Sequence, residues 1–214
     1  MAKPGRSDAS RSPASARSRA TRQALVDAAI ESLRIDGFAG ASARAIASRA
    51  GSNQGLVFYH FGSVSDLLLA ALDEVSSRRM ARYSTAIETA ASPSELVGVA
   101  ARIFREDLDE GYVTVLVEMI AGATTSPALG EAVAARIEPW MSFTRDALEQ
   151  TATGSPLASV MPTEDAAYAV VALYLGLEML SHLDGDRRRA LALFDRASAL
   201  ATLFTTGQMA PTDA

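Results

Sequence analysis

The amino-acid sequence predicts an all-α protein with an N-terminal three-helix bundle that contains a helix-turn-helix, followed by a larger helical domain. Apolar residues recur three and four positions apart along most of the chain, and glycine, proline and serine mark the breaks between these segments. No segment shows the alternation of apolar and polar residues that is typical of a β-strand. The chain has 214 residues, of which 49% are hydrophobic, so a small domain and a larger one can both have a core.

The sequence divides into three expected parts. Residues 1–17 are rich in Ser, Ala, Arg and Pro without apolar periodicity, which indicates a flexible basic arm. Residues 18–78 form the expected small domain, whose long fourth helix starts near Ser63. Residues 79–214 form the larger domain, with further helices expected over 93–110, 111–123, 126–150, 163–183 and 186–205.

Glycines separate the first helices of the small domain. The first expected helix runs over residues 21–36, and Gly37 ends it. Ser42 is a good N-cap for a second helix that runs to Ala50. Gly51 suits the left-handed backbone conformation just after that helix, so a tight turn is expected there.

The third helix, residues 53–61, is polar and aromatic for its length. Val57 and Phe61 are its clear inward anchors, and the small Ala47 and Ala50 of the preceding helix allow the two helices to cross closely. The outward positions are Asn53, Gln54, Leu56, Tyr59 and His60. Amides read adenine edges, apolar side chains contact thymine methyl groups, and hydroxyl or imidazole groups reach phosphates. This composition favours contact with a nucleic acid over burial in a core.

Charge is unevenly distributed along the chain, whose net charge is −5. Residues 1–62 carry a net charge of +5, and residues 63–214 carry −10. A basic N-terminal third on an acidic body suggests a module that faces a polyanion. The alternative is that five of the positive charges belong only to a disordered tail.

Over about residues 18–78 the sequence resembles the TetR family of bacterial transcriptional regulators. The matching pattern is Gly37-Phe38, then Ser42-x-x-x-Ile46-Ala47-x-x-Ala50-Gly51, then Gly55-x-Val57-Phe58-x-His60-Phe61, then Leu67-Leu68. The resemblance implies a DNA-binding domain followed by a helical ligand-binding and dimerisation domain. Two positions depart from the family pattern. Phe58 replaces a tyrosine whose hydroxyl meets phosphate, for which Tyr59 is the candidate substitute, and Val64 replaces a common phosphate-binding lysine.

The resemblance implies a set of DNA contacts around the turn. Ser42 caps the second helix and touches phosphate, Arg44 reaches a base, and the start of the third helix faces the major groove. The candidate DNA-binding residues are Ser42, Arg44, Asn53, Gln54, Gly55, Leu56, Phe58, Tyr59 and His60. Three of them have a structural alternative: Ser42 acts only as a cap, Leu56 is buried, and His60 packs beneath the fourth helix.

Aromatic and methionine side chains of the larger domain suit a mostly apolar pocket for a small-molecule effector of unknown identity. The candidate ligand-binding residues are Tyr83, Phe104, Glu118, Met119, Trp140 and Phe143. Glu118 interrupts an uncharged stretch, and a carboxylate buried there would have a raised pKa and would favour a cation or hydrogen-bond donors. The alternatives are that the aromatic residues are ordinary core and that Glu118 joins Glu110 and Thr114 in a solvated stripe.

The late helices indicate a homodimer. The expected helix 163–183 is apolar nearly all round, and Gly176 within it would allow close approach of another helix. The last helix adds Leu191, Phe194, Leu200, Leu203 and Phe204. Because one chain cannot easily bury every face of a late helix, we expect these helices to form a four-helix bundle with a second copy. The alternative is that the helix is the central core of the larger domain.

Catalysis and metal binding find no support in the sequence. It has no cysteine, two histidines and no HExxH, GxSxG, GxGxxG or GxxxxGK[ST] pattern, so we expect no enzyme, no cofactor and no metal site. The segment with His182, Asp184 and Asp186 is interpreted as a surface helix end. The first 20 residues lack an apolar leader, and no uninterrupted run reaches the roughly 18 apolar residues of a membrane span. A cytoplasmic protein without a membrane partner is therefore expected.

These observations together predict a ligand-responsive regulator, most simply a repressor. It would bind a pseudo-palindromic operator in double-stranded DNA as a homodimer, and a small molecule would release it. The alternative is a helical interaction or enzyme domain in which the helix-turn-helix is only structural.

Overall fold

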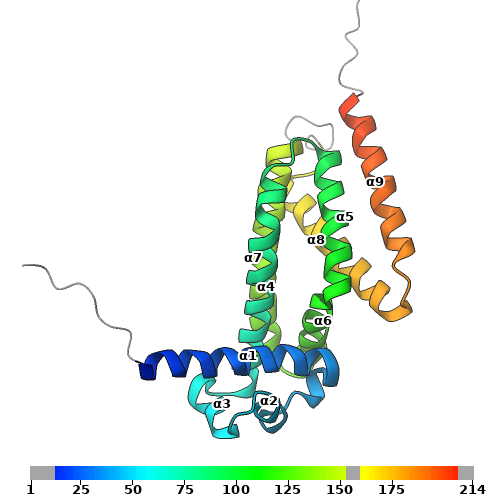
Figure 1. Ribbon diagram of the computed structural model, residues 1–214. Coiled ribbons are helices and arrows are strands. Elements are labelled where there is room, and N and C mark those ends of the chain that lie inside the picture. The colour runs from blue at the N-terminus through cyan, green and yellow to red at the C-terminus, as the bar shows by residue number, and fades with distance from the viewer. Residues whose placement is uncertain (1–12, 153–159, 207–214) are drawn as a thin grey trace, which may run out of the picture. The chain divides into compact units, whose positions relative to one another are not determined.

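The computed structural model describes residues 13–152 and 160–206, and their regular structure is entirely helical (Figure 1). The helices are α1 (Pro13–Gly40), α2 (Ala43–Arg49), α3 (Gln54–Phe61), α4 (Val64–Glu88), α5 (Pro93–Glu110), α6 (Tyr112–Ala123), α7 (Pro127–Ala152), α8 (Thr163–Asp184) and α9 (Arg188–Thr206). The all-α prediction is confirmed. The chain forms two compact units, Met1–Ala71 and Leu72–Ala214, which divide within α4.

Helix α1 begins at Pro13 rather than at Thr21, so part of the segment expected to be an irregular arm is helical. Proline fits the first turn of a helix because its missing N–H has no intrahelical partner there, and the alanines and arginines that follow favour a helix. The rest of the expected arm, residues 1–12, lies outside the described residues. Near its other end, Gly37 has a φ of 69°, which breaks the helical conformation where the sequence predicts the helix to end.

The core of the first unit is formed by α1, α2, α3 and the start of α4. Completely buried apolar side chains from all four meet there: Leu25, Leu33, Ile46, Val57 and Leu67. Arg49, at the end of α2, also ties that helix to α1. Its guanidinium donates to the carboxylate of Asp36 at 2.9 Å and to the hydroxyl of the buried Ser32. These contacts fix the position of α2, the first helix of the helix-turn-helix.

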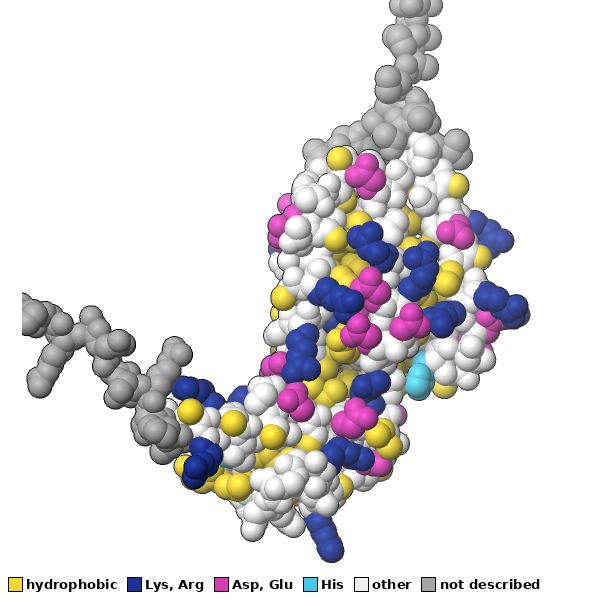
Figure 2. Space-filling model, in the orientation of Figure 1, with side chains coloured by type: hydrophobic (Ala, Val, Ile, Leu, Met, Phe, Trp, Pro, Cys, Tyr) yellow, Lys and Arg dark blue, Asp and Glu magenta, His cyan; other side chains and the backbone are white. Residues whose placement is uncertain are grey.

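The second unit is built on helix pairs and has a core of its own. Helix α5 packs along α9, α7 packs along α8, and α6 contacts α7 (Figure 1). Phe104, Leu177 and Ala190 form a buried apolar cluster between α5, α8 and α9. Leu191 and Phe194, which are expected at an interface with a second copy, pack against this cluster within one chain and are partly buried there. Arginine and acidic side chains alternate with apolar ones over the face of this unit seen in Figure 2.

Helix α8 is apolar but only partly buried. Its exposed large apolar side chains are Tyr168, Val170, Leu173, Met179, Leu180 and Leu183. By length and composition α8 is the one described helix that could cross a membrane by itself, although no uninterrupted apolar run predicts this; α3 and α4 meet the same test only as a pair bent by 72°. The core helix of a soluble protein meets this test too, although only 17% of the apolar window of α8 is buried. The exposed side chains nevertheless form an apolar surface patch, and such patches are typical of interaction sites.

Candidate nucleic-acid interface and buried polar cluster

The turn between α2 and α3 is closed by two backbone hydrogen bonds. The N–H of Ser52 donates to the carbonyl of Ala47 at 2.8 Å, and the N–H of Gly51 donates to the carbonyl of Ser48 at 3.1 Å. Gly51 has a φ of 58°, in the left-handed region that glycine tolerates best. This pattern is a Schellman motif, in which the turn satisfies the last carbonyl groups of the helix. The predicted left-handed glycine is confirmed.

Small and apolar side chains hold α2 and α3 together. Ile46 and Ala47 of α2 and Val57 of α3 are buried, which confirms Val57 as an inward anchor. Phe61, the second expected anchor, is half-buried, and the guanidinium of Arg22 from α1 lies 4.8 Å from the centre of its ring. One side of α3 is therefore fixed against the core, and the other sides are left to solvent.

Both helices of the motif begin with a side-chain cap. The hydroxyl of Ser42 accepts a hydrogen bond from the N–H of Ala45 at 3.2 Å, and the side-chain oxygen of Asn53 accepts one from the N–H of Gly55 at 2.7 Å. A β-carbon at position 55 would lie 3.3 Å from that oxygen, so glycine leaves the cap the room it needs. Ser42, Asn53 and Gly55 are exposed. Ser42 therefore does act as a cap, and its helix end is accessible from solvent.

The remaining predicted DNA-binding residues also reach the surface. Four are exposed: Arg44, Gln54, Phe58 and Tyr59. Tyr59 is 77% exposed, and its ring meets the ring of His60 edge to face with the centroids 4.9 Å apart. Leu56 and His60 are half-buried, so neither is a fully buried core residue. The nine residues therefore line the exposed parts of α2, α3 and the turn between them.

Arg44 differs from Arg49 in its surroundings, although both lie on α2. Arg49 is paired with Asp36, whereas Arg44 is exposed and makes no ion pair with the residues that the structure describes. An arginine must be unpaired in this way to contact a base or a phosphate outside its own chain.

A second candidate site lies inside the second unit. Arg79 of α4 holds Asp107 of α5 through two contacts, because its Nε donates to Oδ1 at 3.0 Å and its Nη2 donates to Oδ2. The hydroxyl of Tyr174 donates to Oδ2 of Asp107 at 2.9 Å, and the hydroxyl of Tyr83 donates to Oδ1 at 3.4 Å. Oε1 of Glu178 on α8 lies 3.7 Å from Nη2 of Arg79. These five residues are called the buried polar cluster below.

Glu178 is the unusual member of the cluster. Its side chain is completely buried, and neither carboxylate oxygen has a hydrogen-bond partner among the described residues. Burial raises the pKa of Glu178 to about 8; the positive charge of Arg79 opposes the rise and the negative charge of Asp107 adds to it. Near neutral pH Glu178 therefore holds a proton, while Asp107 is the ion-pair partner of Arg79.

Four of the six residues predicted for ligand binding lie in the cluster or close around it. Tyr83 belongs to it, and the ring of Trp140 lies 4.8 Å from the cluster's guanidinium carbon. Phe143 meets Trp140 edge to face, and Phe104 meets Tyr174 in the same way. Residues from α4, α5, α7 and α8 thus converge on one polar centre with an aromatic surround.

The two predicted residues on α6 lie in different surroundings. Met119 is completely buried, whereas Glu118 is half-buried. The fully buried carboxylate that the sequence suggested at position 118 is found at Glu178. The sequence does contain a signal for it, because Glu178 is the only acidic or basic residue between Asp165 and His182 on an otherwise apolar helix.

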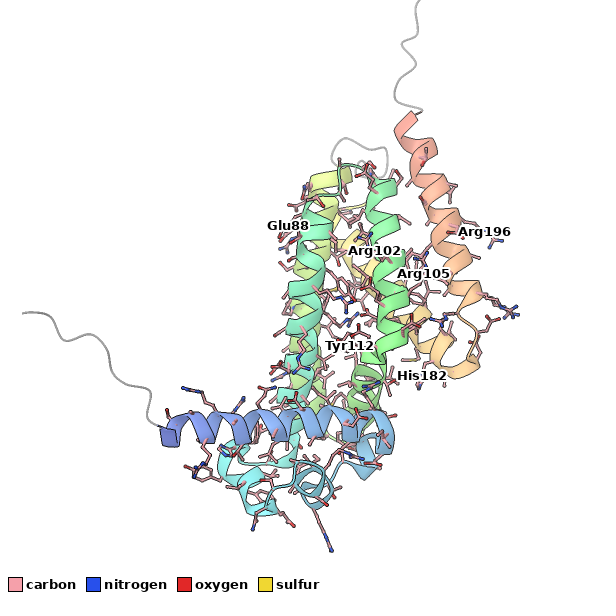
Figure 3. The ribbon with its side chains drawn as sticks, viewed as in Figure 1. Glu88, Arg102, Arg105, Tyr112, His182 and Arg196 are labelled. Carbon is pink, nitrogen blue, oxygen red and sulfur yellow. The ribbon has the colours of Figure 1, made fainter. Side chains whose placement is uncertain are left out.

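His182 lies exposed at the end of α8 (Figure 3). The acidic residues that follow it stabilise the turn between α8 and α9. The carboxylate of Asp184 accepts a hydrogen bond from the N–H of Asp186, and the carboxylate of Asp186 accepts one from the N–H of Arg188. In the described part of the chain, no group of three or more His, Cys, Asp or Glu side chains could hold a metal ion. The segment is a surface helix end, as the sequence was interpreted.

Comparisons with known proteins agree with this architecture. Residues 25–71, which include α2 and α3, match the family model for bacterial regulatory proteins of the tetR family. An HTH-type transcriptional regulator from Mycobacterium bovis is 29% identical over 107 residues, which are 50% of this chain and 55% of that protein. The chain therefore spans about half the length of the curated relatives it matches.

Two solved structures extend the likeness over both units. The multidrug binding protein EbrR, complexed with imidazole, is 26% identical with a TM-score of 0.60, covering 82% of this chain and 93% of that one. A member of the TetR family from Streptomyces coelicolor A3 is 30% identical with a TM-score of 0.63, covering 83% of this chain and 97% of that one. With this identity over nearly a whole relative and a family match at the helix-turn-helix, the chain belongs to the TetR family of bacterial regulatory proteins.

Proposed function

We propose that this protein is a DNA-binding transcriptional regulator, a repressor that binds a pseudo-palindromic operator as a dimer and is released by a small molecule. The observation that carries the proposal is the surface of α3. Val57 anchors this helix, and Gln54, Phe58 and Tyr59 are turned to solvent. The match to the tetR family model covers the helix. A short helix behind a tight turn, with such an exposed surface, has the form that enters a major groove.

Sequence recognition in this proposal depends on two side chains. Gln54 is the first residue of α3, and its amide can donate to and accept from an adenine edge. Arg44 on α2 has the unpaired guanidinium needed for guanine. Tyr59 supplies a phosphate-binding hydroxyl from the same helix as Phe58, which has none. The base contacts select the sequence, and the phosphate contacts set the register.

A homodimer covers the exposed apolar face of α8. Leu173 and Leu180 are 62% and 60% exposed, and Gly176 lies between them with no atom within 4 Å of where its β-carbon would be. Leu193 and Leu200 of α9 are exposed as well. Pairing across a two-fold axis joins four such helices and presents two α3 helices to successive major grooves. Leu203 and Phe204, also expected at this interface, lie outside the described side chains.

The effector binds inside the second unit in this proposal, around the buried polar cluster. Trp140 and Phe104 supply aromatic surface there, and Glu178 supplies a carboxylate. The similar protein EbrR is described in complex with imidazole, which supports a small-molecule site in this fold. Release from DNA requires that the effector bind the DNA-incompetent state more tightly than the competent one.

Salt-dependent DNA binding tests the proposal. Full-length protein is titrated into a labelled duplex taken from the region that flanks its own gene, with a scrambled duplex of equal composition as the control. We expect preferential binding to the natural duplex, with the logarithm of affinity falling linearly with the logarithm of salt concentration. Equal and weak binding to both duplexes would instead favour a helical interaction or enzyme domain with a structural helix-turn-helix.

A further inference from the structure

The buried polar cluster contains more acidic than basic groups. One guanidinium, that of Arg79, faces the two carboxylates of Asp107 and Glu178, and all three side chains are at most 8% exposed. Asp107 receives both close contacts from Arg79 together with the hydroxyls of Tyr83 and Tyr174. Glu178 is left at 3.7 Å from the guanidinium, beyond hydrogen-bond distance.

Neither oxygen of the buried Glu178 carboxyl group therefore has a hydrogen-bond partner among the described residues. Buried polar atoms are nearly always hydrogen-bonded in proteins. Burial removes their hydrogen bonds to water, and this costs free energy unless a new partner replaces the water. A positively charged donor satisfies an ionised carboxylate best, because charge-assisted hydrogen bonds are the strong ones. Perturbed carboxylates of this kind concentrate at functional sites.

Aromatic rings surround the same place. The ring of Trp140 stacks on the guanidinium of Arg79, and the ring of Tyr174 packs against Phe104 and Phe194 with centroid separations of 5.6 and 6.4 Å. The faces of aromatic rings attract cations, as the stacked guanidinium illustrates within the chain. A carboxyl group and aromatic rings therefore lie close together here, with the guanidinium of Arg79 already on the ring of Trp140.

We propose that Glu178 is the group that recognises the effector, and that the effector is a compact organic cation, a protonated amine or amidine, whose N–H groups donate to both carboxylate oxygens. This inference rests on the proposed function, because it assumes that a small molecule binds in this unit. The cation takes the place of the proton: Glu178 ionises, one proton leaves to solvent, and the N–H donors pair with the carboxylate. Trp140 and Tyr174, which are half-buried, move to admit the ligand.

Isothermal titration of the full-length protein with benzamidinium tests this proposal, with neutral benzamide as the matched control ligand. We expect benzamidinium to bind at least about tenfold more tightly than benzamide, because only the cation can replace the proton of Glu178 and pair with the carboxylate that remains. Titrations at neutral pH in two buffers of different ionisation enthalpy should show the release of close to one proton. The affinity for benzamidinium should increase as the pH is raised toward 9, since less proton has to be displaced.

Two isosteric variants locate the effect. Glu178→Gln should lose benzamidinium affinity by about tenfold or more, together with the proton release. Glu138→Gln, which changes an exposed carboxylate on α7, should keep both. The proton-release measurement on the unaltered protein is independent of whether Glu178→Gln folds. No benzamidinium binding, binding without proton release, or equal binding by a folded Glu178→Gln would each overturn the proposal.

DNA binding measured on the same preparations separates this inference from the proposed function. A protein that binds its DNA but not benzamidinium contradicts the cation site alone. A protein that does not bind DNA contradicts the proposed function, whether or not benzamidinium binds.

Discussion

The carboxylate of Glu178 lies 3.7 Å from the guanidinium of Arg79 and accepts no hydrogen bond from a described residue, although its side chain is completely buried. Asp107 holds the same guanidinium through two contacts and also receives the hydroxyls of two tyrosines. The side chains of Arg79, Asp107 and Glu178 come from α4, α5 and α8. The protonation of Glu178 therefore depends on the packing of these helices. The pH dependence of the free energy of unfolding measures this link, and the effector need not be known.

The free energy of unfolding should fall as pH rises between about 5 and about 8. Burial raises the pKa of Glu178 from 4.5 to about 8, so over this range the folded protein holds a proton that the unfolded chain has released. The stability that Glu178 contributes is fully present at low pH, and it is lost as the pH rises through the pKa of Glu178 in the folded protein. Its slope is at most about 1.4 kcal/mol per pH unit for one proton. Urea unfolding at a series of pH values measures it.

Glu178→Gln should flatten this pH profile. Burial raises the pKa of Asp107 as well, so a smaller slope of the same sign remains. Arg79 stays charged and Tyr174 stays neutral over the range, since the pKa of each is raised further above neutrality. Glu138→Gln, at an exposed position, should keep the original slope. A Glu178→Gln profile parallel to the unaltered one would show that the proton is held elsewhere.

Arg79→Met should destabilise the second unit by about 3–5 kcal/mol, because it leaves the buried carboxylate of Asp107 without its cation. Arg78→Met is the matched control, since this neighbouring arginine pairs with Glu74 at the surface and its side chain is 46% exposed. Loss of that exposed pair should change the free energy of unfolding by less than about 1 kcal/mol. Chemical unfolding of both variants measures the difference, and equal losses would argue against the structural role of the cluster.

Gly51→Ala should destabilise the first unit by about 1 kcal/mol, because alanine is strained at the φ of 58° in the turn. Gly98→Ala is the control with the opposite expected sign. Gly98 lies inside α5, and an added β-carbon there meets no atom within 4 Å, so alanine should stabilise by about 0.5–1 kcal/mol. Thermal unfolding of the two variants compares them. A neutral Gly51→Ala would contradict the left-handed turn.

Leu173→Glu combined with Leu180→Glu should convert the protein to a monomer without unfolding it. Both side chains are mostly exposed in one chain, so the charges are tolerated there but not in an apolar interface between two copies. Ile35→Glu is the control, because Ile35 is equally apolar and 63% exposed but lies on α1. Sedimentation equilibrium at micromolar concentration gives the oligomeric state. If the unaltered protein is already a monomer, the proposed dimer is wrong.

The helix-turn-helix was predictable from sequence because its determinants are local. Ser42 and Asn53 each cap a helix by accepting a hydrogen bond from an N–H two or three residues further along the chain. Gly51 adopts the left-handed backbone conformation, which few other residues adopt. The start of α1 at Pro13 is not evident from sequence, because a serine, alanine and arginine composition suits a flexible arm as well as a helix. Composition alone does not separate the two.

The buried polar cluster was only partly predictable, because it depends on the packing of helices that are distant in sequence. Tyr83 and Trp140, which aromatic content suggests as ligand contacts, do lie at this polar centre, but aromatic content gives no indication of its charges. Asp107 stands in an acidic stretch that resembles a solvated helix end, and only tertiary packing buries it. Glu178 is a lone charge on an apolar helix, but so is the half-buried Glu118, so this signal alone does not identify the buried carboxylate.

The most direct test of the account is base-resolved DNA binding by Arg44→Ala, measured on the natural duplex and on every single-base variant of it. We predict a loss of about 1–3 kcal/mol on the natural site and loss of preference at one base position in each half-site. Arg34→Ala is the control, since Arg34 pairs with Glu31 on α1. The account is contradicted if the unaltered protein binds the natural duplex no better than a scrambled one.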